Sequence, residues 1–363
     1  MTIDDLLNQP TPRWFSGIRT DDIVIGTVGR MVRNLRGFSF PGWSTEEERR
    51  AVSKKLLPVL QKLKGFDNAF CAEMSSLSYE NRRALLVRKL LTPAMAARQK
   101  GCYLVIPQRQ NLTCMVNEEE HLVIHAFLKG NKITDSVSVL SQLNEQLEEK
   151  LKFAETPGIG YLTSMPGEAG DGIQIYSMLH LPGLSISNTI PQVVKAMEKL
   201  HLNLSPCYSD GEEGTGNMYI LYTIPGPAGS TDEICQHYAG VLRQLIQRER
   251  QLRAKLTRDR ELHLQDGVAR AYATLCHARR ISLRESRNAI SLLRLGTQQG
   301  LITWKHHVPN EMVSVLRELD YLIAFTTAQT TENEEPALPM LRADITRDFM
   351  KRYPAELIDY LTQ

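Results

Sequence analysis

The sequence lacks long apolar runs and holds no two cysteines in a C-x-x-C arrangement. No stretch approaches the roughly 18 apolar residues of a membrane-spanning helix, so we expect no membrane segment. The first seven residues are acidic where a signal peptide would be basic. Six scattered cysteines offer no zinc-ribbon spacing and no secreted disulfide framework, so we expect reduced thiols. These absences predict a soluble, cytoplasmic protein.

Charge is nearly balanced across the 363 residues, with 43 Lys and Arg against 41 Asp and Glu. This balance predicts neither a nucleic-acid binder nor an acidic-surface protein. One stretch, residues 243–294, holds 13 basic against five acidic side chains. It suits an acidic partner, a phosphorylated protein or nucleic acid. A solvated helix face is favoured, because no aromatic residues interleave with the charge, and we do not expect a nucleic-acid partner.

Apolar runs bounded by polar turns predict strands in the first two thirds of the chain. The run at 23–25 leads into residues 26–30, which contain two glycines and are expected to form a loop. The predicted strands are 23–25, 103–106, 112–116, 122–128, 160–163 and 218–224.

Helices are predicted by capping boxes and by apolar residues at three- and four-residue spacing. Ser44 with Glu47, and Ser230 with Glu233, have the spacing of capping boxes and mark two helix starts. Leucines at helical spacing predict another helix over residues 135–151. After Thr257 the pattern is helical throughout.

This change in pattern predicts an α+β fold in two domains. We expect an N-terminal segment over residues 1–21, a mixed domain over 22–255 and an all-helical C-terminal domain over 256–363. The length permits a core that is stable without disulfides or metals.

Four segments, in order, carry a resemblance to a known family. They are residues 26–34 (GTVGRMVRN), 117–123 (NEEEHLV), 160–182 (GYLTSMPGEAGDGIQIYSMLHLP) and 205–213 (SPCYSDGEE). A further segment, LRLG at 293–296, resembles a V-R-L-G motif. Together they resemble the phosphagen kinases, the ATP:guanidino phosphotransferases, and within them the bacterial protein-arginine kinases.

The resemblance implies a catalytic domain built on a large antiparallel sheet flanked by helices, with Mg-ATP as the phosphoryl donor. It implies a protein substrate recognised through arginine side chains, and a C-terminal helical domain that supports homodimer formation. Carried over by position, Glu119 and Glu213 are the catalytic carboxylates, which would orient the substrate guanidinium and accept its proton. The nucleotide-binding positions that correspond are Thr27, Arg30, Ser177 and Asp210.

The sequence departs from the family pattern where phosphate-binding arginines are expected. Those positions hold Val28, Val123, Gln174 and Ser205, and the reactive-loop cysteine is replaced by Met165. Such enzymes surround the transferred phosphoryl group with cations. Charge-assisted hydrogen bonds are worth about 1.5–3 kcal/mol each, so four losses would remove roughly 6–12 kcal/mol if they added. We therefore expect weak ATP binding.

Several features have a plainer interpretation. Without the family spacing, residues 118–120 would be a solvated acidic turn. His121 and His125 are four apart, but they fall on a predicted strand without a third ligand, so no metal site is expected. Glycines at 167, 170 and 172 lack the G-K-[ST] of a phosphate loop. The C-terminal phosphoarginine-reading motif R-D-x-x-R-A keeps only Arg342 of its two arginines.

These observations lead to a hypothesis of a pseudokinase or strongly impaired kinase that acts by binding arginine-containing or partner proteins, with no nucleotide required. The alternative is an active Mg-ATP-dependent protein-arginine kinase with a rearranged nucleotide site, in which Arg30 and Arg33 supply charge. A third possibility is an adaptor that works only through residues 257–363.

Overall fold

The computed structural model describes residues 1–8, 11, 22–208, 214–224, 230–259, 261–330 and 337–357. The chain forms two compact units. Gly26–Ser177 and Tyr222–Ala239 make up most of the first, and Met178–Leu221 and Gly240–Gln363 make up most of the second. Because each unit combines separated stretches of the chain, the boundary at 255/256 stays a prediction.

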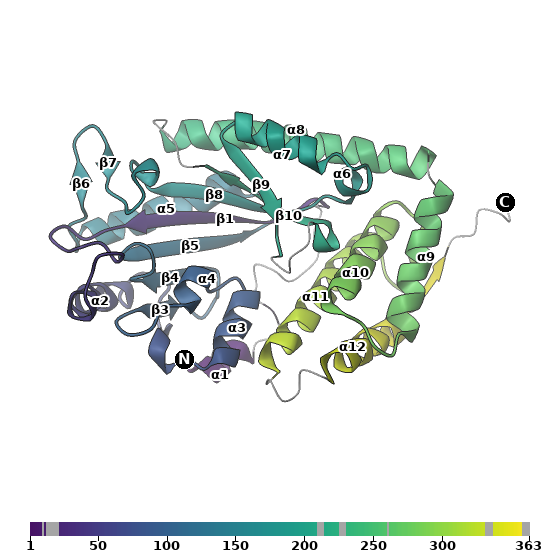
Figure 1. Ribbon diagram of the computed structural model, residues 1–363, viewed down its shortest axis with the longest axis horizontal. Helices are drawn as coiled ribbons and strands as arrows, with labels where there is room; N and C mark the ends of the chain where they lie inside the picture. Colours follow the sequence, from purple (N-terminus) through teal and green to yellow (C-terminus); the bar gives the residue numbers. More distant parts are fainter. Residues whose placement is uncertain are drawn as a thin grey trace. The chain divides into compact units, whose positions relative to one another are not determined.

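An antiparallel sheet carries the α+β fold and confirms the fold class (Figure 1). Its eight strands lie in the order β2-β3-β4-β5-β1-β8-β10-β9, and the ladders from β2 through β5 to β1 are antiparallel. The strands are β1 (Val24–Arg33), β2 (Phe70–Glu73), β3 (Tyr103–Ile106), β4 (Leu112–Val116), β5 (Leu122–Lys129), β8 (Ile173–His180), β9 (Leu202–Pro206) and β10 (Met218–Thr223).

Most predicted strands occur at the expected places, and one predicted loop is wrong. The strand expected at 160–163 is shortened to β7 (Gly160–Tyr161), which pairs with β6 (Glu155–Thr156). Residues 26–30 are not a loop, because β1 continues through them and pairs with β5 as far as Arg33. Gly29 packs closely against α5 there, since a Cβ would lie 2.8 Å from Cδ1 of Leu140 and 3.3 Å from the carbonyl oxygen of Ser136.

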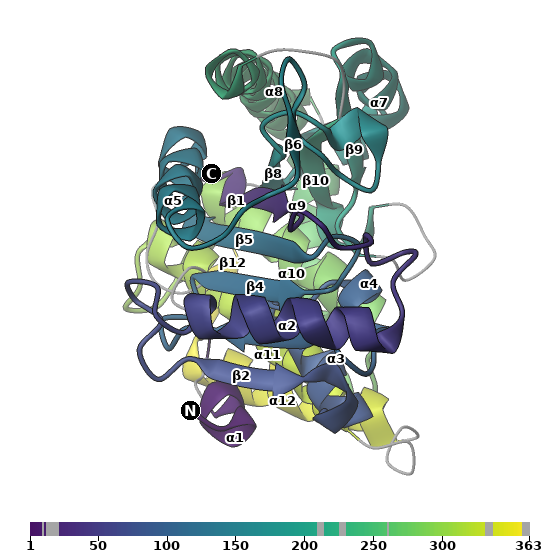
Figure 2. The same ribbon diagram turned by 90° about the vertical axis from the view of Figure 1, so that its left-hand side faces the viewer.

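Helices α2 (Glu46–Leu60) and α5 (Ile133–Glu148) cover one face of the sheet in the first unit (Figure 2). Their apolar residues, such as Leu56 and Leu140, pack with Met31 and Ile124 of the strands in one buried cluster. The remaining helices before α9 are α1 (Ile3–Leu7), α3 (Tyr79–Val87), α4 (Pro93–Ala96), α6 (Pro182–Ile186), α7 (Ile190–Lys199) and α8 (Thr231–Asp259).

One of the two predicted helix caps is confirmed, and the other is displaced by one residue. Ser230 and Glu233 form the expected reciprocal bonds at the start of α8. At α2 the capping box is made by Thr45 with Glu48 rather than by Ser44.

The C-terminal region is helical, as expected, with one small exception. Helices α9 (Glu261–His277), α10 (Leu283–Gln298), α11 (Pro309–Gln329) and α12 (Leu338–Arg352) share a buried core that includes Val268, Leu293 and Leu316. A two-stranded sheet, β11 (Ile302–Trp304) with β12 (Ala355–Leu357), corrects the all-helical prediction. In the described part of the chain, no helix combines the length and apolarity that crossing a membrane requires.

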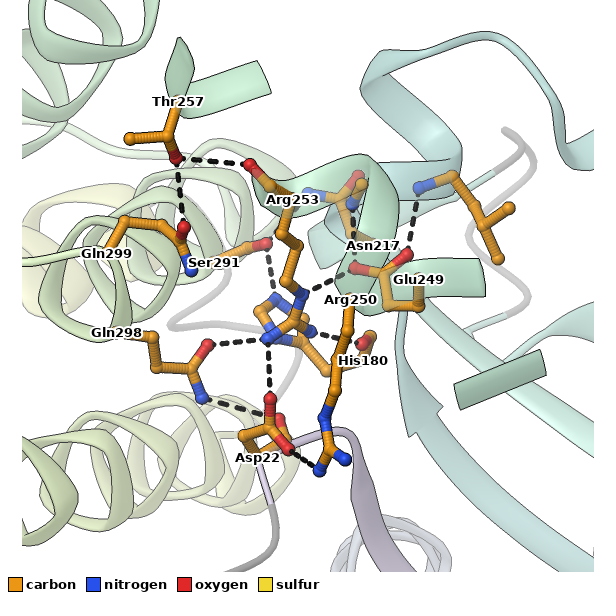
Figure 3. Close-up of polar contacts among 12 residues, drawn as sticks. Asp22, His180, Asn217, Glu249, Arg250, Arg253, Thr257, Ser291, Gln298 and Gln299 are labelled. Carbon is orange, nitrogen blue, oxygen red and sulfur yellow. Dashed lines mark hydrogen bonds and ion pairs between the residues drawn. The ribbon is translucent and has the colours of Figure 1, made fainter. Parts of the chain in front are cut away.

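A buried ionic network in the second unit ties α8 to the end of β8 (Figure 3). Arg253 Nε donates to Glu249 at 2.6 Å, and its Nη2 donates to the carbonyl of His180 at 2.8 Å. Its Nη1 donates to Gln298 at 2.8 Å and to Asp22 at 3.3 Å. All three guanidinium nitrogens of Arg253 are therefore used.

Candidate functional site

The turn between β4 and β5, residues 117–121, is anchored by Asn117. This residue has a left-handed φ of 59°, which asparagine tolerates better than most residues. Its side-chain Nδ2 donates to the carbonyls of Arg49 at 2.8 Å and Gly101 at 2.7 Å, and to Ser53 Oγ at 3.1 Å. The backbone of the turn therefore has a fixed position.

Three successive glutamates of this turn have different environments. Glu118 and Glu120 are 2% and 1% exposed, whereas Glu119 is exposed. Glu118 accepts a hydrogen bond from Thr92, and Glu120 accepts two from Ser164, at 2.7 and 2.8 Å. Burial raises the pKa of Glu118 and of Glu120. Only Glu119, the predicted catalytic carboxylate, is presented to solvent by the turn.

The two histidines near this turn have structural surroundings. His121 accepts from the backbone N–H of Leu35 at 3.0 Å through Nδ1, and its Nε2 bonds the carbonyl of Ser39 at 2.9 Å. Residues four apart on a strand are about 13 Å apart, so His121 and His125 do not form a helical zinc pair. Burial and the nearby Arg30 lower the pKa of His125 to about 3. Among the described residues, no group of three potential metal ligands occurs.

Arg30 lies on β1 and is 7% exposed. Its Nη1 donates to Glu168 at 3.0 Å and to Gln174 Oε1 at 2.9 Å. Tyr176 donates to the same Gln174 oxygen at 2.7 Å. Arg30 makes no other hydrogen bond with a described residue. The N–H groups of its Nε and Nη2 therefore remain available to a ligand. Of the phosphate-binding arginines that the family resemblance leads us to expect in this unit, Arg30 is retained.

Arg33, which the active-kinase alternative invokes, is committed to the structure. Its Nε donates to Asn144 at 2.7 Å, and its Nη1 donates to the carbonyls of Val32 at 2.7 Å and Asp171 at 2.9 Å. Its guanidinium carbon lies 3.5 Å from the centre of the Tyr161 ring. Burial lowers the pKa of Arg33 to about 10. We therefore do not count it as a phosphate ligand.

The other positions carried over to the first unit are largely buried. Thr27 is fully buried, donates to the carbonyl of Gly130 at 2.7 Å and accepts from Lys132 N–H at 3.1 Å. Val123 is also fully buried, and Ser177 is buried beside Tyr238. Val28 is partly exposed on β1. None of these four supplies a cation.

The remaining predicted positions belong to the second unit or lie outside the described residues. Ser205 is partly exposed on β9. Asp210 and Glu213 lie outside the described residues, so the pairing of Glu119 with Glu213 stays a prediction. Sequence reasoning missed Thr92 and Ser164, which hold the flanking glutamates. Thr92 lies outside the four motif segments, and Ser164 lies within residues 160–182 but was not singled out there.

This arrangement suits a guanidinium better than a triphosphate. Glu119 offers an exposed carboxylate on a fixed turn, which can accept hydrogen bonds from an arginine side chain. Among the phosphate-binding positions carried over to the first unit, positive charge for a polyphosphate is limited to Arg30, which already pairs with Glu168. In this conformation the carried-over positions of the first unit offer a nucleotide's phosphates the N–H groups of Arg30 that Glu168 and Gln174 leave unused.

The fold and these motifs are those of the guanidino phosphotransferase family, and comparison with known proteins agrees. A family model described as the ATP:guanido phosphotransferase, C-terminal catalytic domain, matches residues 51–252. A second, described as the Protein-arginine kinase McsB C-terminal domain, matches residues 261–359. The chain belongs to the ATP:guanido phosphotransferase family, which confirms the resemblance read from the sequence.

Two bacterial relatives are similar over most of their length. The Protein-arginine kinase of Halothermothrix orenii is 30% identical over 336 residues, which cover 92% of this chain and 94% of that protein. The Protein-arginine kinase of Bacillus cereus is 28% identical over 305 residues, which cover 83% of this chain and 86% of that protein.

Solved structures support the fold. Lombricine kinase superposes with a TM-score of 0.57 at 20% identity, covering 70% of this chain and 78% of that one. The duplicated taurocyamine kinase from Schistosoma mansoni, solved with transition state analog components, gives a TM-score of 0.55 at 22% identity. That match covers 67% of this chain but only 37% of the duplicated kinase.

Proposed function

We propose that this chain catalyses Mg-ATP-dependent phosphorylation of arginine side chains in proteins, slowly, through a rearranged nucleotide site. The observation that carries the proposal is the fixed presentation of Glu119 between two buried glutamates. Similarity to a protein named Protein-arginine kinase across 92% of the chain supports the same reaction. The comparisons thus favour the active alternative over the pseudokinase expected from the sequence.

In this proposal the substrate is a protein, and the residue recognised is arginine. Glu119, together with Glu213, orients the guanidinium and removes its proton as the nitrogen is phosphorylated. Arg30 uses its remaining donors, Nε and Nη2, on a phosphate oxygen of the nucleotide. We also propose that the chain forms a homodimer through its helical C-terminal region and works in the cytoplasm.

A second candidate is a protein that binds arginine side chains but transfers no phosphoryl group. The observation that favours it is the ion pair between Arg30 and Glu168, 3.0 Å long, beside the neutral Gln174. Phosphate binding would then lose its surviving cation in the first unit. Exposed Glu119 would still bind a guanidinium, so arginine recognition and catalysis are separable.

The test is formation of acid-labile phosphoarginine on an arginine-rich protein in the presence of Mg-ATP. We expect slow product formation that falls about 100-fold in Glu119→Gln, because positioned proton transfer contributes at least that factor. Glu149→Gln, at the exposed end of α5, is the matched control and should react like the parent. Absence of phosphoarginine from a folded parent that still binds the protein would favour the second candidate.

A further inference from the structure

Glu168 is placed on Arg30 by a loop that is itself firmly docked. Residues Tyr161 and Gly170 exchange two backbone hydrogen bonds, at 2.8 and 3.1 Å. Asp171 accepts from the backbone N–H of Thr231 at 3.0 Å, and also from the Thr231 hydroxyl, at the first turn of α8. The loop therefore has anchors on both sides that do not involve Arg30.

Close backbone approach fixes the same loop further. Gly160 has a φ of 98°, and a Cβ there would lie 2.7 Å from the carbonyl oxygen of Gly170. Gly172 has a φ of 61°, and its Cβ would lie 2.8 Å from Nη1 of Arg33. Both positions need glycine because the conformation is left-handed and the space is filled. The backbone conformation of the loop consequently fixes the position of Glu168 beside Arg30.

The pair is sheltered enough for its charge to matter. The Arg30 and Glu168 side chains are 9% and 12% exposed. A carboxylate in this environment neutralises the guanidinium that a phosphate would otherwise use, and it repels an anion placed on the neighbouring donors. An Arg–carboxylate contact also has the geometry of an Arg–phosphate contact.

We propose that Glu168 is the residue that sets the nucleotide affinity of this site, by holding Arg30 as an internal competitor of the nucleotide phosphate. This inference rests on the proposed function, because it takes the phosphate of Mg-ATP as the competing ligand. Glu168 acts through Arg30 and is a positioning residue. When its carboxylate leaves, Nη1 of Arg30 joins Nε and Nη2 as a donor for phosphate.

The experiment is calorimetric titration of the full chain with Mg-ATP, comparing the parent with Glu168→Gln. Glutamine keeps the size of the side chain and its hydrogen bond but removes the charge. We expect affinity to increase about tenfold, the factor that corresponds to loss of one charge-assisted contact. The matched control is Glu155→Gln, which removes the charge of an exposed carboxylate on β6 that pairs with Arg36 instead of Arg30.

A double-mutant cycle shows whether the effect passes through Arg30. In an Arg30→Gln background, Glu168→Gln should change affinity less than twofold. The proposal is overturned if Glu168→Gln does not tighten binding, if it does so equally without Arg30, or if Glu155→Gln tightens binding as much. Failure of both the parent and Glu168→Gln to bind Mg-ATP at millimolar concentration also overturns it.

Failure of the proposed function has a different signature. Suppose that Glu168→Gln binds Mg-ATP more tightly but forms no phosphoarginine. That result would support the role of Glu168 in nucleotide affinity and refute the proposed kinase activity. Circular dichroism of each variant confirms that the fold is retained.

Discussion

Two buried arginine–glutamate pairs, one in each compact unit, show how the same pair of side chains can serve different ends. Arg253 and Glu249 are 2% and 0% exposed, and every nitrogen of the guanidinium has a partner. Glu249 also accepts from the N–H groups of Gly183 and Leu184, each at 2.8 Å. Nothing in this network is left for a ligand, so its role is structural.

In the pair of Arg30 and Glu168, part of the guanidinium forms no hydrogen bond with a described residue. Both hydrogen bonds of Arg30 leave from Nη1, and its partner comes from a loop rather than from its own helix or strand. A guanidinium that donates from one nitrogen can exchange its partner for a ligand. One that donates from all three nitrogens has no donor left for a ligand. The contrast teaches that burial alone does not distinguish a structural arginine from a ligand-binding one. The number of guanidinium donors already in use makes that distinction.

The largest expected effect tests the saturated pair. Arg253→Gln removes the cation and leaves the Glu249 carboxylate buried, so we expect the free energy of unfolding to fall by about 3–5 kcal/mol. Urea denaturation followed by circular dichroism measures this. A loss below about 1 kcal/mol would mean that the Arg253 network is not structural, and the comparison would fail on that side.

The next effect tests the partly used pair. Arg30→Gln should weaken Mg-ATP binding at least tenfold, because it removes the surviving guanidinium of the site in the first unit. We expect it to lower the free energy of unfolding by only about 1 kcal/mol, since Arg30 donates two hydrogen bonds, both from Nη1, and glutamine keeps an amide donor there. Calorimetry and urea denaturation on one preparation give both values. Unchanged affinity with severe destabilisation would make Arg30 a second structural arginine.

The smallest effect concerns Glu118, which is buried near Arg30. Burial, opposed by Thr92 and Arg30, raises the pKa of Glu118 above its ordinary value of 4.5. The folded state therefore holds this proton more tightly than the unfolded state. The contribution of Glu118 to stability consequently falls as pH rises from 4.5 through the raised pKa.

Glu118→Gln removes this titration while keeping an acceptor for Thr92. Its stability relative to the parent should be lowest near pH 4.5, rise across that window and become level above it. Urea midpoints at a series of pH values measure the difference. A difference that stays constant with pH would show that Glu118 has the same pKa in both states.

Much of the fold could be predicted from the sequence, because the patterns that mark its strands and helix caps involve neighbouring residues. The strand pattern at 103–128 and the cap at Ser230 depend on residues a few positions apart, and both occur as expected. The prediction of a loop at 26–30 was wrong because Gly29 lies in a strand and packs closely against Leu140 of α5. That contact involves a residue more than a hundred positions away.

The candidate site was accessible to a smaller degree. Aligned motifs gave the positions of Glu119 and Arg30, but not that Glu118 and Glu120 are buried while Glu119 is exposed. The ion pair of Arg30 with Glu168 joins residues 138 positions apart, and no motif encodes it. In the structure, the Glu168 carboxylate contacts the guanidinium that a phosphate would use.

One measurement tests the central claim most directly: a single-turnover assay of the parent with ATP labelled at the γ-phosphate and an arginine-rich acceptor protein. We predict label that appears on arginine, is lost in acid, and accumulates faster in Glu168→Gln than in the parent. Acceptor protein that stays unlabelled with both proteins, under conditions where each is folded and binds Mg-ATP, would contradict the account.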